Sequence, residues 1–212
     1  METKLKTGGG ARLRGIDVSH YQGDVDWDEV AGAGVAFAYV KATEGMTGRD
    51  PAYARHRRGA RAENLRVGAY HFFRPDDDPQ KQADHFLSVV EVRAGDLPPA
   101  LDLERADAEE AGEAFRDAAL AWLKRVETAT GCAPVVYASP VFWNSHLGAD
   151  FASYRYWLAE YASKPNPPKT APPWTFWQHS QRGQVPGVHG MVDLNWSAAG
   201  DLSAMLCGGT PS

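Results

Sequence analysis

Short strand-like runs alternate with helical patterns through the first two thirds of the chain, and this alternation constrains the fold most strongly. Several runs are continuous apolar stretches, which is typical of strands buried on both faces. Strands that alternate with helices form parallel βαβ units, because each helix returns the chain to the edge where the next strand begins. The eight runs are residues 13–18, 35–43, 66–73, 99–104, 133–139, 156–161, 175–180 and 191–196.

Three helical patterns lie between the early runs, and each begins or ends at a residue typical of helix caps. Asp50 and Pro51 begin the first helix, and Asp78 begins the second. The third follows the fourth run and ends at Gly131. Apolar residues recur at helical spacing in the last two, and they are Ala83, Phe86, Leu87 and Val90, then Ala111, Phe115, Ala118, Ala119, Trp122, Leu123 and Val126.

The last third of the chain departs from this alternation. Residues 162–174 are rich in proline and residues 181–190 in glycine, so neither segment can be an ordinary crossover helix. The sequence therefore predicts an α/β fold, an irregular TIM-like (β/α) barrel of eight strands and about five helices, with the helices missing from the C-terminal third. Residues 1–12 are interpreted as a flexible leader, which leaves residues 13–212 as a single catalytic barrel domain.

Composition excludes some classes of partner. The net charge of −5 argues against nucleic acid and anionic membranes, which require a clustered basic face. The one basic run, residues 55–61, is interpreted as the solvated face of a helix. No stretch approaches the roughly 18 apolar residues of a membrane span, and the N-terminus lacks the apolar region of a secretory signal peptide. We expect a monomer that does not insert into membranes.

Cysteine and histidine spacing gives no sign of a metal centre. Cys132 and Cys207 lack the C-x-x-C spacing, and they are either buried thiols or one long-range disulfide. The seven histidines contain no H-x-H or H-E-x-x-H pattern, so a zinc hydrolase is not indicated. We expect neither a metal nor a cofactor.

Four acidic residues lie at predicted strand ends. Asp17 ends the first run, Asp102 and Glu104 end the fourth, and Asp193 ends the eighth. Asp102 and Glu104 are two residues apart, so on a strand both project to the same face. In a parallel barrel the carboxyl ends of the strands form the catalytic face. One such pair is explained by a solvated strand end, but four acids at one rim favour a shared carboxylate site.

Aromatic and amide side chains accompany the acids at the same predicted rim. Flat apolar rings interleaved with hydrogen-bonding groups suit a sugar, which has apolar C–H faces and polar edges. Each aromatic residue could instead belong to the packed interior of the barrel. The candidate substrate-binding residues are Tyr70, His71, Tyr137, Trp157, Tyr161, Trp177, Gln178 and Asn195.

Eight motifs along the chain closely resemble those of glycoside hydrolase family 25, the Chalaropsis-type lysozymes or N-acetylmuramidases. The resemblance covers about residues 13–206, nearly the whole chain, and so many motifs in the family's order are a specific signal. It implies hydrolysis of the β-1,4 bond between N-acetylmuramic acid and N-acetylglucosamine in the glycan strand of bacterial peptidoglycan. The motifs are GIDVSHYQGDVDW, VKATEG, GAYHFF, ALDLE, VVYAS, WLAEY, FWQHS and VDLNW.

The resemblance also implies roles for the acids. Glu104 matches the family's proton donor, Asp102 matches its partner acid, and Asp17 and Asp193 match the flanking acids of the groove. A glycosidic oxygen leaves only when protonated, and the oxocarbenium-like centre requires nearby negative charge. Two departures are visible. His179 stands where the family more often has an aromatic residue such as tyrosine, and the chain lacks a wall-binding repeat.

The spacing of Asp102 and Glu104 also bears on mechanism. Two acids on one strand are poorly placed to flank a sugar from opposite sides, so either Asp193 supplies the opposite group or the substrate's own acetamido oxygen attacks. We expect the substrate-assisted route, with net retention. Two other classes remain as alternatives, a metal-dependent barrel hydrolase that uses the four acids and an inactive peptidoglycan-binding barrel. A peptidoglycan hydrolase would act extracellularly or at the cell wall, after secretion or release by lysis.

Overall fold

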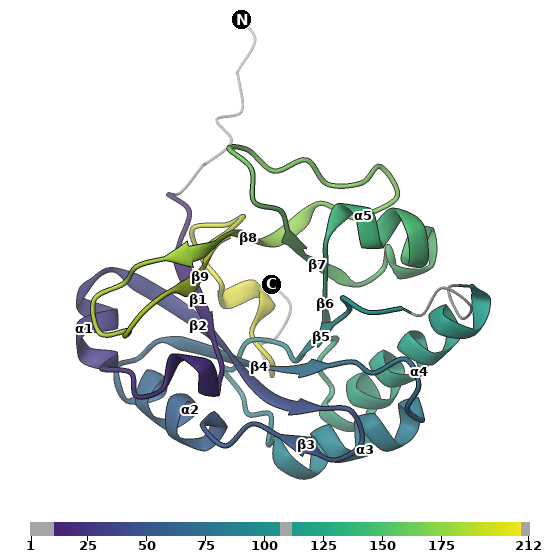
Figure 1. Cartoon of the computed structure of the whole chain (residues 1–212), viewed down its shortest axis with the longest axis horizontal. Helices are drawn as coiled ribbons and strands as arrows, with labels where there is room; N and C mark the ends of the chain where they lie inside the picture. The colour runs from purple at the N-terminus through teal and green to yellow at the C-terminus, as the bar shows by residue number, and fades with distance from the viewer. Residues whose placement is uncertain (1–10, 107–111, 209–212) are drawn as a thin grey trace, which may run out of the picture.

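Nine strands form a single sheet that closes on itself in the computed structural model, which describes residues 11–106 and 112–208 (Figure 1). The order is β1-β9-β8-β7-β6-β5-β4-β2, and pairing between β1 and β2 closes this eight-stranded barrel. The short β3 pairs with the end of β2. The strands are β1 (Arg14–Val18), β2 (Val35–Glu44), β3 (Gly48–Arg49), β4 (Arg66–Phe72), β5 (Ala100–Asp102), β6 (Val135–Ala138), β7 (Arg155–Ala159), β8 (Trp174–Gly183) and β9 (Val192–Ser197).

The predicted barrel is confirmed, but one strand direction is not as expected. Within the barrel, β1, β2 and β4 through β8 pair in parallel, whereas β9 is antiparallel to both of its neighbours, β1 and β8. The short β3, outside the ring, is antiparallel to β2. The glycine-rich segment after β8 contains no helix to carry the chain back, so the chain turns directly into β9. Asp193 therefore lies near the start of β9 and not at its end, and it is opposite Asp17 in the pairing with β1.

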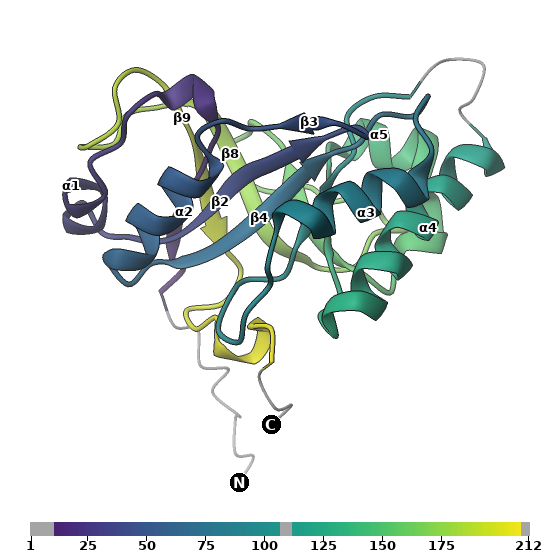
Figure 2. The same ribbon diagram turned by 90° about the horizontal axis from the view of Figure 1, so that it is seen from below.

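Five α-helices lie outside the barrel, and none of the described residues after β7 forms another (Figure 2). This matches the predicted number and the predicted loss of helices in the C-terminal third. They are α1 (Trp27–Gly32), α2 (Tyr53–Ala62), α3 (Pro79–Val89), α4 (Glu113–Thr130) and α5 (Pro140–Phe142); shorter turns are η1 (His20–Gln22), η2 (Trp143–Leu147), η3 (Gly148–Phe151) and η4 (Ser203–Met205).

The predicted helix starts are only partly correct. Asp78 caps α3 by accepting hydrogen bonds from Gln80 N and Lys81 N, and Gly131 ends α4 in the left-handed conformation, both as predicted. Asp50 does not cap α2, which begins after Ala52. Ala111, assigned to the α4 stripe, is outside the described residues. Helix α1 and strand β3 are absent from the prediction because each is too short to show a periodic pattern.

Aromatic rings fill the interior of the barrel below the rim at which the parallel strands end. The rings of Phe37 and Tyr39 on β2 pack against Gly15 and Gly68, and a Cβ on either glycine would come within 2.3 Å of the ring. Trp157 on β7 stacks on Tyr39 at 4.5 Å between ring centroids. The other face of the strands packs against the helices in a second apolar layer. These rings therefore fill the interior of the barrel at this level.

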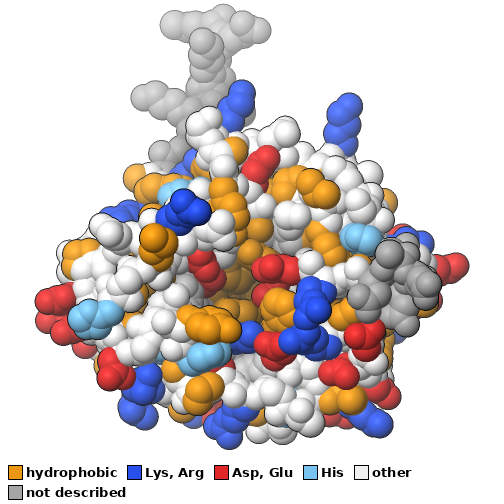
Figure 3. Space-filling view, in the orientation of Figure 1, with side chains coloured by type: hydrophobic (Ala, Val, Ile, Leu, Met, Phe, Trp, Pro, Cys, Tyr) orange, Lys and Arg blue, Asp and Glu red, His pale blue; other side chains and the backbone are white. Residues whose placement is uncertain are grey.

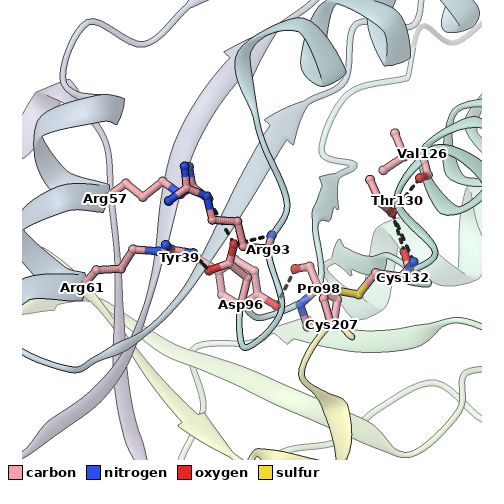
Figure 4. The surroundings of a disulfide bond; sticks show 10 residues. All are labelled: Tyr39, Arg57, Arg61, Arg93, Asp96, Pro98, Val126, Thr130, Cys132 and Cys207. Atoms are coloured by element: carbon pink, nitrogen blue, oxygen red, sulfur yellow. Dashed lines mark hydrogen bonds and ion pairs between the residues drawn. A yellow bond between two sulfur atoms is a disulfide. The ribbon is translucent and has the colours of Figure 1, made fainter. Parts of the chain in front are cut away.

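The described chain begins and ends at the end of the barrel away from the β3 rim (Figure 2). Cys132, after α4, and Cys207, after η4, form a disulfide across a sequence separation of 75, which decides between the two alternatives for these cysteines (Figure 4). Residues 1–10 of the predicted leader lie outside the described residues, while the Arg12 guanidinium lies 5.0 Å from the centre of the Trp174 ring. No helix among the described residues is long and apolar enough to cross a membrane.

Candidate active site

A pocket of about 180 Å³ opens at the rim where the parallel strands end. It corresponds to the hollow near the centre of the face in Figure 3, where acidic side chains border apolar ones. All four predicted acids line it, together with five of the eight predicted substrate-binding residues. The lining residues are Asp17, Tyr70, Asp102, Glu104, Tyr137, Trp157, Tyr161, Gln178, Gln181 and Asp193.

The acids reach the pocket from opposite sides of the barrel. Asp102 is the last residue of β5, and Asp193 is the second residue of β9. Three strands separate β5 from β9 in either direction around the ring, so the two carboxyl groups approach from opposite walls. Glu104 lies beyond the end of β5, not on the strand as predicted, but Leu103 N still donates to Tyr137 O at 3.0 Å. The chain therefore continues along β6 and carries Glu104 to the pocket.

Asp17 is a buried carboxylate held by two amides. Gln178 Nε2 donates to Asp17 Oδ2 at 3.0 Å, and Asn195 Nδ2 donates to the same oxygen at 2.7 Å. Burial raises the pKa of Asp17, while these hydrogen bonds oppose the rise by stabilising the charged form. Asp17 is thus fixed in place and has little freedom to follow a reacting substrate.

Asp193 lies beside Asp17, and the two carboxyl groups are close enough to share a hydrogen bond. Burial, followed by the neighbouring charge of Asp17, raises the pKa of Asp193 from 3.8 to about 8. Two carboxyl groups at such close range cannot easily both ionise. This pair therefore holds a proton at neutral pH.

Asp102 is buried and has an unused acceptor. Its Oδ1 has no hydrogen-bond partner among the described residues. Burial, and then the charge of Glu104, raises the pKa of Asp102 well above its usual value, and the Lys41 ammonium acts in the opposite direction. A buried oxygen without a donor is costly, so it indicates a place where a ligand's N–H or O–H can bind.

Hydrogen bonds fix the wall around the acids. The hydroxyl groups of Tyr137 and Tyr161 both donate to Gln178 Oε1, at 2.9 and 2.8 Å. Trp157 Nε1 donates to Asn195 Oδ1 at 2.8 Å. The amides that hold Asp17 thus also hold two tyrosines and a tryptophan. Asn195 lies beneath the pocket as a support and is not part of its lining.

Two predicted sugar contacts besides Asn195 lie outside the pocket. His71 is fully buried between the barrel and the helices, where it stacks on Trp122 of α4 at 5.3 Å. Burial there lowers the pKa of His71 to about 3. Trp177 is also on the outer face of its strand, and its Nε1 donates to Glu160 O at 2.7 Å. Adjacent residues on a strand face opposite sides, so Tyr70 and Gln178 reach the pocket while these two do not.

Two other residues of β8, Gln181 and His179, bear on the site predicted from the sequence. Gln181 lines the pocket but is not among the predicted residues, because it falls in the glycine-rich segment read as a loop. His179, the departure from the family pattern, stacks on Trp196 at 5.7 Å and is not part of the pocket lining. The replacement at position 179 therefore leaves the pocket unchanged.

The pocket continues into a longer depression. A hollow of about 300 Å³ shares Glu104, Tyr137, Tyr161 and Gln181 with it. Tyr161 is 53% exposed, so its ring is accessible to a ligand. A continuous depression lined by aromatic rings and acids can hold several units of a polymer.

Comparison with known proteins decides the family. The sequence profile described as glycosyl hydrolases family 25 matches residues 16–188. The chain belongs to this family. It is 40% identical to the uncharacterized protein YegX of Escherichia coli K12 over 188 residues, which cover 86% of this chain and 68% of that protein. It is 35% identical to Lysozyme M1 of Streptomyces globisporus over 196 residues, covering 86% and 67%.

The family 25 fold is also matched by solved structures. A bacterial lysozyme from Streptomyces coelicolor superposes with a TM-score of 0.81 at 34% identity, covering 90% of this chain and 92% of that one. The family 25 chain is therefore a glycoside hydrolase, as the sequence motifs indicate. Among its described residues, no group of three or more histidine, cysteine or acidic side chains is arranged to hold a metal ion.

Proposed function

We propose that this family 25 hydrolase is a lysozyme that cleaves the β-1,4 bond between N-acetylmuramic acid and N-acetylglucosamine in bacterial peptidoglycan. The observation that carries the proposal is the convergence of Asp17, Asp102, Glu104 and Asp193 in one pocket walled by tyrosine and tryptophan side chains. Acids supply the proton and the negative charge that glycoside cleavage requires, and aromatic rings suit sugar faces. Relatives named as a lysozyme and as an N,O-diacetylmuramidase support the same substrate.

Glu104 is the proposed proton donor. It is exposed at the junction of the pocket with the neighbouring hollow, so it can reach a glycosidic oxygen and exchange its proton with water. Asp17 is held by Gln178 and Asn195 and acts as a positioning residue for the opposite wall. The division of roles follows general acid–base catalysis, in which the acid must approach the departing oxygen.

The attacking group is proposed to be the substrate's own acetamido oxygen. Asp102 Oδ1 is a buried acceptor that the acetamido N–H can fill, which would direct the acetamido oxygen to the anomeric carbon. As the C–O bond breaks, Glu104 gives its proton to the leaving oxygen. The positive charge that develops on the acetamido group favours the ionised form of Asp102, which opposes the raised pKa of this carboxyl group in the free site and lets it stabilise that charge. Glu104 then removes a proton from water that attacks the same carbon, and the bond between this carbon and the acetamido oxygen breaks, which restores the acetamido group. Two displacements at one carbon leave the product with retained configuration.

Direct attack by Asp193 fits the site less well. A covalent nucleophile must be ionised, yet the raised pKa of about 8 leaves Asp193 protonated at neutral pH. Its position beside Asp17 suits it to binding a sugar hydroxyl and to stabilising charge as the substrate enters. We accordingly assign Asp193 a supporting role on the wall opposite Asp102.

Product analysis tests the function. A suspension of peptidoglycan should clear, and the new reducing ends should be N-acetylmuramic acid. Glucosamine reducing ends, or no new ends, would refute the assignment, and the second result would instead match an inactive binding barrel. For the mechanism, a glycan whose muramic acid lacks the N-acetyl group should bind but hardly turn over. Normal turnover of that glycan, or an inverted product, would exclude substrate assistance.

The site also suggests how the protein is organised and where it acts. We propose that residues 13–212 form one catalytic barrel domain that works as a monomer on the glycan strand. All pocket residues come from one chain, so the site needs no second copy to be complete. Its substrate would place it outside the cytoplasm, at a cell wall. Size-exclusion chromatography with light scattering tests the monomer.

A further inference from the structure

A second hollow, of about 330 Å³, lies on the outside of the barrel between α2 and the segment after α3. Its lining is dominated by guanidinium groups and includes no acidic side chain. We call its five arginines the arginine cluster. The lining residues are Arg49, Tyr53, Ala54, Arg57, Arg58, Arg61, Val89 and Arg93.

The nearby acids do not neutralise the arginine cluster. Arg57 and Arg61 both bind the buried carboxylate of Asp96, as Figure 4 shows, and Arg93 pairs with Glu91. Five guanidinium groups therefore meet two carboxylates. Arg49 and Arg58, both exposed, have no ion pair among the described residues. The excess positive charge stands out in a chain whose net charge is −5.

Tyr53 provides a second, independent observation. Its side chain lines the hollow and is only 3% exposed, yet its hydroxyl has no hydrogen-bond partner among the described residues. Burial raises the pKa of Tyr53 to about 12, so the hydroxyl remains a donor at neutral pH. A buried donor without an acceptor is costly. An anion that entered the hollow would supply that acceptor.

We propose that the arginine cluster binds a phosphodiester-linked anionic polymer of the bacterial wall. Arginine forks bind phosphate oxygens two at a time, as they bind carboxylate oxygens, so the arginine cluster suits an anion with repeated charged groups. The guanidinium groups of the cluster outnumber the carboxylates that pair with them, five to two, so the hollow has room for more than one anionic group. A polymer with repeated phosphates can contact several of these arginines at once, whereas a single phosphate can contact only part of the cluster.

Two other phosphate-bearing partners fit less well. Single-stranded nucleic acid would require exposed aromatic rings for stacking, and the one aromatic residue lining the hollow, Tyr53, is buried. A membrane surface would require exposed apolar side chains next to the charges. The large exposed hydrophobic residues among those described are Tyr21, Val141, Tyr161 and Met191, and none lines this hollow.

Titration of the whole chain with soluble poly(glycerol phosphate) tests the proposal. The double variant Arg58→Gln/Arg93→Gln should bind about tenfold more weakly or worse, because each lost guanidinium removes charge-assisted hydrogen bonds. The matched control is Lys124→Gln/Arg125→Gln on α4, which removes the same charge from exposed positions outside the cluster. It should keep wild-type affinity. Equal losses in both variants would show that net charge alone is responsible and would overturn the site.

Tyr53→Phe separates binding from folding. It should weaken polymer binding several-fold while leaving the melting temperature of the free protein unchanged or higher, since the hydroxyl has no partner to lose. Unchanged affinity in this variant would remove Tyr53 from the site.

The remaining outcomes also decide the question. No binding of the polymer by the wild type would refute the proposal. Tighter binding to phosphatidylglycerol vesicles than to the polymer would indicate a membrane, and equally tight binding of inorganic phosphate would indicate a small anion; either would overturn it. The choice of a cell-wall polymer rests on the proposed function at the cell wall. Polymer binding is measured without glycan cleavage, so failure of the binding proposal and failure of the proposed function can be told apart.

Discussion

The four acids of the pocket have the same chemistry but different surroundings, and the surroundings separate their roles. Asp17 accepts hydrogen bonds from two amides, Asp193 shares a proton with Asp17, and Asp102 keeps an oxygen without a donor. Only Glu104 is exposed. A mobile, solvent-accessible acid can move a proton in both directions, whereas buried carboxyl groups bind and orient. Substitutions at these positions should therefore have different consequences.

Replacement of the proposed proton donor should abolish catalysis without affecting the fold. Glu104→Gln preserves volume and removes only the transferable proton, so we expect the clearing rate to fall by at least about 100-fold. The circular dichroism spectrum and melting temperature should match the wild type. Glu113→Gln, at the exposed start of α4, is the matched control and should keep full activity. Near-normal clearing by Glu104→Gln would remove Glu104 from the mechanism.

The raised pKa of Asp193 should appear in the pH dependence of stability. Its carboxyl group binds a proton more tightly in the folded protein than in the unfolded chain. The stability that this proton provides is present below about pH 4 and is lost as the pH rises toward 8. Asp193→Asn should therefore flatten the free energy of unfolding between pH 5 and 8 and be more stable than the wild type at pH 8.

Urea unfolding at pH 5 and pH 8 measures this difference. Asp117→Asn, at an exposed position on α4, is the control and should show the wild-type pH dependence. The idea fails if Asp193→Asn and the wild type lose stability equally over that range. The substitution also replaces the carboxyl group proposed to bind a sugar hydroxyl, so the clearing rate should fall. A lower clearing rate together with higher stability at pH 8 would show that this carboxyl group serves function at a cost in stability.

Strands and helices limit what the sequence alone can reveal about the site. Continuous apolar runs predict the barrel strands well, because strands buried on both faces need apolar residues throughout. Because both faces of such a strand are apolar, the sequence does not show which side chains point into the barrel. Tyr70 and His71 look equivalent in the sequence, yet one lines the pocket and the other lies under α4. Trp177 and Gln178 differ in the same way.

Strand direction is hidden for a different reason. The loop before β9 shows that no crossover helix is present, but the antiparallel return of β9 depends on closure of the whole barrel. Asp193 reaches the predicted rim because it stands at the start of a reversed strand. Pairing of Cys132 with Cys207 likewise depends on the folded structure, which brings the segment after α4 next to the C-terminal segment. Local patterns predict the elements, while direction and pairing are properties of the closed sheet.

Capping of α3 gives a test at a single helix end. Asp78 accepts hydrogen bonds from Gln80 N and Lys81 N at 2.9 and 3.1 Å. Asp78→Ala should lower the free energy of unfolding by about 1 kcal/mol, because two helix-end N–H groups lose their acceptor. Asp78→Asn retains an acceptor and should stay close to the wild type. Chemical denaturation measures both, and equal stability of all three proteins would show that the cap contributes nothing.

The two ends of the barrel have separate roles, one in catalysis and one in stability. The pocket opens at the rim with β3. Both described ends of the chain lie at the opposite end of the barrel (Figure 2), and the disulfide joins Cys207, near the described C-terminal end, to Cys132. Cys207 N donates to Asp96 O at 2.8 Å, and Gly95 N donates to Cys207 O at 2.9 Å. The disulfide and these hydrogen bonds thus hold the C-terminal segment at the end of the barrel opposite the pocket. Stability and catalysis should be separable across this axis, as in other barrels of this architecture.

The disulfide allows that separation to be tested. Cys132→Ser/Cys207→Ser should lower the free energy of unfolding by about 2–4 kcal/mol, because an open loop gives the unfolded chain more freedom. The clearing rate at 25 °C should remain that of the wild type, since the bond lies at the end of the barrel away from the pocket. Wild-type protein unfolded in the presence of dithiothreitol should match the variant, and the variant should not respond to the reductant. A clearing rate that fell in proportion to stability would show that the lower end of the barrel also shapes the active site.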